Sequence, residues 1–140
     1  MSITTATSSA KILYIDDDSD DCIFLMESFL ANGSNTDLIC MNDGDAAINY
    51  LNEIHKQNEA FPSLIILDLN MPRRDGRQTL SYIKSCDYLA NIPVVILSTS
   101  ENNSDKEACG LLGAVSYFQK PFHYSGYKNI VSDCIHFIKA

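Results

Sequence analysis

The sequence predicts one α/β domain built around a mostly parallel, five-stranded sheet. Short apolar runs alternate along the chain with segments of helical periodicity, which is the pattern of βαβ units. The runs are continuously apolar, as expected for strands that helices cover on both faces. The 140 residues, 46% of them hydrophobic, suffice for one core and are too few for two.

The first half of the chain contains two of these units. Ile12–Ile15 is too short for a helix, so we expect a strand that ends at Asp16. The helix that follows should stop before Asn32-Gly33, a typical helix end. A second strand is expected over Leu38–Met41, and Asp43-Gly44 opens a second helix.

The second half repeats the pattern three times. The expected strands are Leu64–Leu67, Val94–Leu97 and about Ser116–Gln119, and the expected helices span about 76–85, 104–112 and 124–138. No internal repeat or Pro/Gly-rich linker interrupts this order. We therefore place no domain boundary within residues 11–140 and expect residues 1–10 to form a loose N-terminal tail.

Composition limits the partners. Ten Lys and Arg residues against 18 Asp and Glu residues give a net charge of -8, which repels nucleic-acid phosphates and anionic lipid. No apolar run approaches the ~20 residues of a membrane span, and the first residues lack the apolar region of a signal peptide. We expect a cytoplasmic protein with neither a nucleic-acid nor a membrane partner.

The five cysteines lie far apart and include no C-x-x-C pair. We expect them to be small, buried, reduced side chains, as is usual in the cytoplasm.

Polar residues follow the predicted strands at their carboxyl ends, where open α/β sheets bind their ligands. They are Asp16-Asp17-Asp18 after the first strand, Asp68 after the third, Ser98 after the fourth and Lys120 after the fifth. Two carboxylates about 4 Å apart repel by about 4 kcal/mol at an effective dielectric constant near 20. A hard cation such as Mg2+, which prefers oxygen ligands, removes that conflict.

Such a crevice suits phosphoryl transfer. A carboxylate beside Mg2+ can act as a nucleophile and form an acyl phosphate, while Lys120 supplies a positive charge and Ser98 a hydroxyl donor for the phosphoryl oxygens. Pro121 could turn the chain sharply after Lys120, through a cis bond, and aim the amine inward.

The sequence resembles the receiver domains of two-component response regulators from about Lys11 to Ile138. The matching segments are Ile12–Asp18, Leu64–Pro72 with Asp75-Gly76, Pro93–Ser98 and Gly113–Phe122. The amino-acid sequence of Leu69–Arg77 is similar to that of stand-alone regulators related to the partners of cyanobacterial phytochromes. The resemblance implies a flavodoxin-like, doubly wound (βα)5 fold with strand order 2-1-3-4-5.

The resemblance also implies a role for each site residue. Asp68 would be the phospho-acceptor, Asp17 a direct Mg2+ ligand, Asp16 a ligand acting mainly through water, and Asn70 the source of a backbone carbonyl ligand. Lys120 would contact the phosphoryl group, and Ser98 and Tyr117 would be the switch residues.

The implied function is a switch and not an enzyme acting on a separate substrate. Asp68 would take a phosphoryl group from a sensor histidine kinase or a histidine phosphotransfer protein. Only Lys139 and Ala140 follow the last expected helix, so we expect no effector domain. The signal would pass to another protein, or to a second copy of the chain, through the face made by the fourth helix, fifth strand and fifth helix.

Two alternatives remain open at this point. Asp16-x-Asp18 after an apolar strand is similar to the nucleophile and acid/base pair of haloacid-dehalogenase-like phosphatases, although no later acidic pair follows near Tyr117–Phe122. The chain could also be a receiver-like interaction module that is never phosphorylated.

We expect Asp18, Asp20 and Asp21 to stabilise the first turn of a helix rather than to bind metal.

Overall fold

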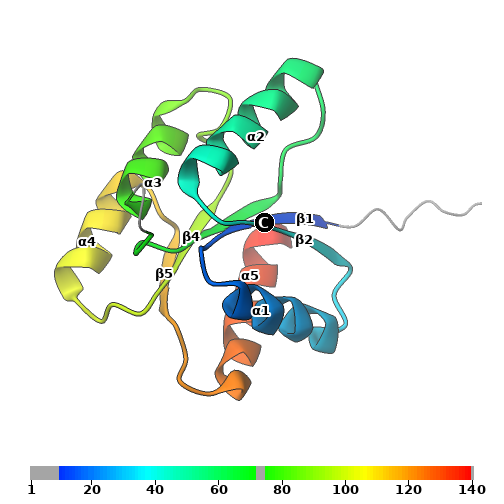
Figure 1. Cartoon of the computed structure of the whole chain (residues 1–140), viewed down its shortest axis with the longest axis vertical. Helices are drawn as coiled ribbons and strands as arrows, with labels where there is room; N and C mark the ends of the chain where they lie inside the picture. Colours follow the sequence, from blue (N-terminus) through cyan, green and yellow to red (C-terminus); the bar gives the residue numbers. More distant parts are fainter. Residues whose placement is uncertain (1–9, 72–74, 140) are drawn as a thin grey trace, which may run out of the picture.

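The computed structural model describes residues 10–71 and 75–139. Within them, five strands alternate with five α-helices, and one short 3-10 helix precedes the last of these (Figure 1). The strands are β1 (Ala10–Ile15), β2 (Thr36–Met41), β3 (Leu64–Leu67), β4 (Val94–Ser98) and β5 (Ser116–Gln119). The helices are α1 (Ser19–Asn32), α2 (Gly44–Gln57), α3 (Gly76–Ser85), α4 (Asn103–Leu112), η2 (Tyr124–Gly126) and α5 (Tyr127–Lys139).

The predicted fold is confirmed. All neighbouring strands are parallel, and their order is β2-β1-β3-β4-β5. The expected tail boundary is one residue late, because Ala10 already pairs with Thr36 at the start of β1. The rest of the expected tail, residues 1–9, and Pro72 of the matching segment lie outside the described residues.

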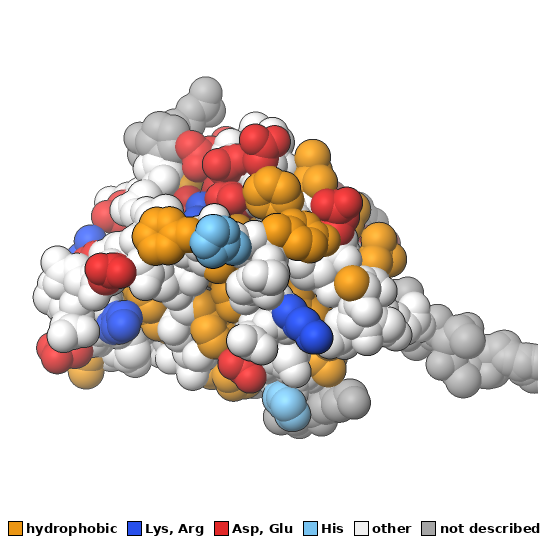
Figure 2. Space-filling view, turned by 90° about the horizontal axis from the view of Figure 1, so that it is seen from below, with side chains coloured by type: hydrophobic (Ala, Val, Ile, Leu, Met, Phe, Trp, Pro, Cys, Tyr) orange, Lys and Arg blue, Asp and Glu red, His pale blue; other side chains and the backbone are white. Residues whose placement is uncertain are grey.

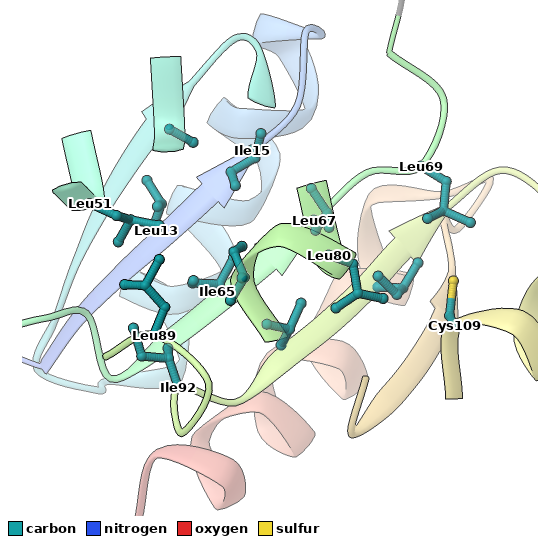
Figure 3. Close-up of a cluster of buried hydrophobic side chains, with 14 of the residues drawn as sticks. Leu13, Ile15, Leu51, Ile65, Leu67, Leu69, Leu80, Leu89, Ile92 and Cys109 are labelled. Carbon is teal, nitrogen blue, oxygen red and sulfur yellow. The ribbon is translucent and has the colours of Figure 1, made fainter. Parts of the chain in front are cut away.

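Two buried clusters hold the helices against the sheet. Leu13 and Ile15 of β1 point to the face that carries α2, α3 and α4, where they join the cluster drawn in Figure 3. Ile12 and Tyr14 point to the opposite face and pack with residues of α1 and α5. Side chains alternate between the faces of a strand, so a strand with helices on both sides must be apolar throughout.

One expectation about the cysteines is wrong. Cys22 of α1 and Cys40 of β2 form a disulfide, with their Cα atoms 6.4 Å apart. Cys86, Cys109 and Cys134 are free, and the last two are buried as expected. The two cysteines are 18 positions apart in the sequence, one on a helix and one on a strand, and only the folded chain brings them together. The sequence pattern therefore did not reveal the pair.

The surface of the described residues is strongly acidic in places. Acidic side chains gather at the upper edge of the face in Figure 2, in keeping with the net charge of -8. No helix in residues 10–71 and 75–139 has both the length and the apolar composition needed to cross a bilayer.

Candidate functional site

The site residues sit one position beyond the strands, held by hydrogen bonds that continue the sheet. The backbone N–H of Asp68 donates to the carbonyl of Ile15 at 2.9 Å, and that of Lys120 donates to the carbonyl of Ser98 at 2.7 Å. The N–H of Asp16 likewise donates to Met41 at 3.0 Å. These bonds fix the backbone of three charged residues at one edge of the sheet.

Asp16, Asp17 and Asp68 form a compact acidic cluster. One carboxylate oxygen from each lies within 4.8 Å of the others, with Asp16 and Asp68 buried and Asp17 exposed. Burial raises the pKa of Asp68 to about 7, and the neighbouring charge of Asp16 acts in the same direction. The Lys120 amine and the backbone N–H of Asn70 only partly oppose this shift.

The amine of Lys120 reaches into this cluster. Its Nζ lies 2.8 Å from Asp16 Oδ2 and 3.6 Å from Asp68 Oδ2. Burial disfavours the ammonium form, but the carboxylates of Asp16 and Asp21 outweigh burial and raise the pKa of Lys120. The amine therefore stays charged at neutral pH. No peptide bond is cis within the described ranges, so the suggested cis bond before Pro121 is wrong; the backbone N–H of Lys120 is held by the Ser98 carbonyl and its amine by the neighbouring carboxylates.

Ser98 and Tyr117 are linked through one residue of the loop after β4. The buried Ser98 Oγ accepts hydrogen bonds from the Ser100 N–H at 3.2 Å and from Asn70 Nδ2 at 3.3 Å. The Tyr117 hydroxyl donates to the Ser100 carbonyl at 3.0 Å. A movement of Ser98 would therefore disturb the same peptide segment that holds the Tyr117 ring.

A comparison with known protein families decides the assignment. The model of the response regulator receiver domain family matches residues 12–132. The chain belongs to the response regulator receiver family. Receiver domains are in general phospho-acceptors and not enzymes that act on a separate substrate.

Individual relatives and solved structures agree with this assignment. Response regulator Rcp1 of Synechocystis is 37% identical over 78% of this chain and 75% of its own length, and the probable methanogenesis regulatory protein FilR2 of Methanothrix harundinacea is 31% identical over 87% and 79%. The phosphorylated cyanobacterial phytochrome response regulator RcpA superposes with a TM-score of 0.84 at 33% identity, over 95% of this chain and 96% of that one. The predicted similarity to phytochrome-related regulators is therefore confirmed.

The structure also contains site contacts that the sequence did not predict. Asp18 caps α1 as expected, and Asp20 lies in its first turn. Asp21 also lies in that turn, as expected, and its carboxylate in addition accepts a hydrogen bond from Lys120 Nζ at 2.7 Å. These two residues are 99 positions apart, so no spacing in the sequence could relate them.

Gly76 also makes a close contact that the sequence did not predict, although the Asp75-Gly76 pair is part of the receiver resemblance. A Cβ at Gly76 would lie 2.6 Å from the Cα of Leu69 and closer still to the Asp68 carbonyl oxygen. Only glycine allows α3 to begin against the backbone of Asp68 and Leu69.

Proposed function

We propose that Asp68 accepts a phosphoryl group, in a Mg2+-dependent reaction, from the phosphohistidine of a sensor histidine kinase or a histidine phosphotransfer protein. One observation carries this proposal: the buried Asp68 lies beside two further aspartates and the charged amine of Lys120. A structural strand end has no need of such costly charge crowding.

The oxygen donors fit a hard divalent cation. Asp17, Asp68 and the backbone carbonyl of Asn70 would bind Mg2+ directly, and Asp16 would act mainly through water. Rcp1 has been solved in a Mn(2+)-bound form, at 34% identity and a TM-score of 0.79, over 89% of this chain and 90% of that one. The bound cation would neutralise charge on the carboxylates and on the incoming phosphoryl oxygens.

The residues divide the reaction among them. An Asp68 carboxylate oxygen forms the new P–O bond while the P–N bond to the donor imidazole breaks, and that imidazole keeps the electron pair and takes up a proton. Lys120 neutralises charge on one phosphoryl oxygen, and the Ser98 hydroxyl donates to another. Hydrolysis by water of the acyl phosphate on Asp68 would reset the switch, so no separate substrate is turned over.

The output would pass through the face formed by α4, β5 and α5. The Ser98–Ser100–Tyr117 connection runs from the site to β5 and supports this choice. Lys106 of α4 is exposed with its amine 5.8 Å from the centre of the Tyr117 ring, so this face contains a cation that a partner could contact. We propose a downstream protein or a second copy of the chain as the partner, in the cytoplasm, with no nucleic acid or membrane involved.

Intact mass after incubation with acetyl phosphate and Mg2+ tests the phosphoryl transfer. We expect one added phosphoryl group, labile at alkaline pH, on the wild type and none on Asp68→Asn. Equal labelling of both would refute Asp68 as the acceptor. No labelling of either would favour the unphosphorylated interaction module, and turnover of a generic phosphomonoester would revive the phosphatase alternative.

Amide exchange with and without beryllofluoride tests the output face. We expect the changes in surface amide exchange to be concentrated in α4, β5 and α5. We also expect the Lys106→Glu variant to have altered partner affinity or dimerisation, while acetyl phosphate still labels its Asp68. Changes confined to α2 and α3 would refute this face. A partner must bind the two states differently, because equal binding shifts no equilibrium.

A further inference from the structure

The Lys120 amine lies closer to Asp21 than to the phospho-acceptor. Nζ is 2.7 Å from Asp21 Oδ2, 2.8 Å from Asp16 Oδ2 and 3.6 Å from Asp68 Oδ2. An ammonium group has three donors, so Asp21 and Asp16 occupy two of them. In this state the amine is drawn toward α1 rather than toward Asp68.

Asp21 is itself held in place. The Tyr127 hydroxyl donates to Asp21 Oδ1 at 3.3 Å, which leaves Oδ2 directed at the lysine. Tyr127 is buried at the start of α5, and α5 packs against α1, where Asp21 sits in the first turn (Figure 1). The Asp21 side chain is only 16% exposed, so it is an ordered neighbour of Lys120 and not a surface charge that solvent screens.

Resting on the proposed phosphoryl transfer, we infer that Asp21 is a positioning residue that competes with the phosphoryl group for the Lys120 amine. When a phosphoryl oxygen arrives at Asp68, it must take the third donor of Lys120 or replace Asp21. Asp21 thereby weakens the hold of the site on its anion and shortens the lifetime of the phosphorylated state.

Removing the charge of Asp21 should therefore favour anion binding. An Asp21→Asn side chain has nearly the same shape but no longer offers a charged acceptor to the amine. Lys120 would remain anchored by Asp16 at 2.8 Å, so it should not become disordered. The amine would need to move by less than 1 Å to bring the 3.6 Å separation from Asp68 into hydrogen-bond range, roughly 2.8 Å.

The test is a titration of the full chain with beryllofluoride, a phosphoryl mimic, at saturating Mg2+. Bound fluoride is followed by 19F NMR. We expect Asp21→Asn to reach half-saturation at about tenfold lower beryllofluoride, a shift of the size that one charge-assisted bond can produce. The fluorine signal nearest the amine should also shift. Tyr127→Phe, which releases Asp21, should change both readouts in the same direction but less.

Asp20→Asn is the matched control. It makes the same change of charge on the same helix turn, but Asp20 is exposed and its side chain has no contact with Lys120, so it should behave as wild type. Urea unfolding of each variant checks that the fold is retained. If wild type binds beryllofluoride and Asp21→Asn binds no more tightly than Asp20→Asn, the inference is overturned while the phospho-acceptor proposal stands. If wild type gives no bound signal, both fail together.

Discussion

Tyr14 and Lys120 share one oxygen of the Asp16 carboxylate. The Tyr14 hydroxyl donates a hydrogen bond to Oδ2, and Lys120 Nζ lies 2.8 Å from the same atom. The other oxygen, Oδ1, accepts the Asp18 N–H at 2.9 Å. Both oxygens of Asp16 are therefore already engaged, whereas the described residues place no hydrogen-bond donor on the carboxylate of Asp17.

This arrangement predicts unequal metal-binding roles. Asp17→Ala should weaken Mg2+ binding by about tenfold or more, because it removes a direct charged ligand. Asp16→Ala should weaken it less, because Asp16 would reach the cation through water. Calorimetric Mg2+ titration measures both affinities, with the exposed Asp20→Ala as a control. Equal affinities in the Asp16 and Asp17 variants would contradict the assignment.

The raised pKa of Asp68 predicts how pH affects the metal-free protein. The pKa is about 7 in the folded chain against an ordinary value of 3.8, so between these pH values the folded chain binds more protons than the unfolded one. The free energy of unfolding should then fall as pH rises from 4 to 7, by up to about 1.4 kcal/mol per pH unit for a single group.

Urea unfolding in the presence of a chelator measures this dependence. Asp68→Asn should flatten the slope because it removes the titrating group, and Mg2+ should restore the lost stability at neutral pH in wild type only. The same slope in wild type and Asp68→Asn would show that other groups cause it.

Ser98→Ala should separate phosphorylation from its effect. The variant loses a donor to the phosphoryl group, so acetyl phosphate should label it about a hundredfold more slowly, but Asp68 remains available. It also loses the acceptor for the Ser100 N–H, so beryllofluoride should no longer change amide exchange around Tyr117. Thr99→Ala, at the exposed neighbouring hydroxyl, should respond as wild type. A normal response in Ser98→Ala would place the coupling elsewhere.

The disulfide predicts a redox-dependent stability. Replacing both Cys22 and Cys40 by serine should lower the free energy of unfolding by about 3 kcal/mol, the value expected for a loop of roughly this length. A reductant should lower the free energy of unfolding of the wild type to that of the double variant. The Cys86→Ser variant should respond to reductant as the wild type does. Urea unfolding with and without reductant measures the effect. A wild type that does not respond to reductant would show that the bond does not form in solution, in keeping with the expected cytoplasmic location.

Much of the fold was readable from local pattern. The continuous apolar runs, such as Leu64–Leu67, identify strands covered on both faces, and the helical spacing between them identifies the alternation. The site followed from the same reading, because parallel strands deliver Asp16, Asp68 and Lys120 to one edge. These features depend on order along the chain, which the sequence states directly.

Only the tertiary structure determined which side chains meet. Asp21 and Lys120 are 99 positions apart, and Cys22 meets Cys40 only because α1 packs over β2. Tyr14 is buried in β1 among apolar side chains, yet its hydroxyl donates a hydrogen bond to Asp16. Pairings of this kind depend on the rotation of each helix and on the depth of each side chain in the packed core. Local periodicity carries no information about either, because both are fixed by contacts between segments that are distant in sequence.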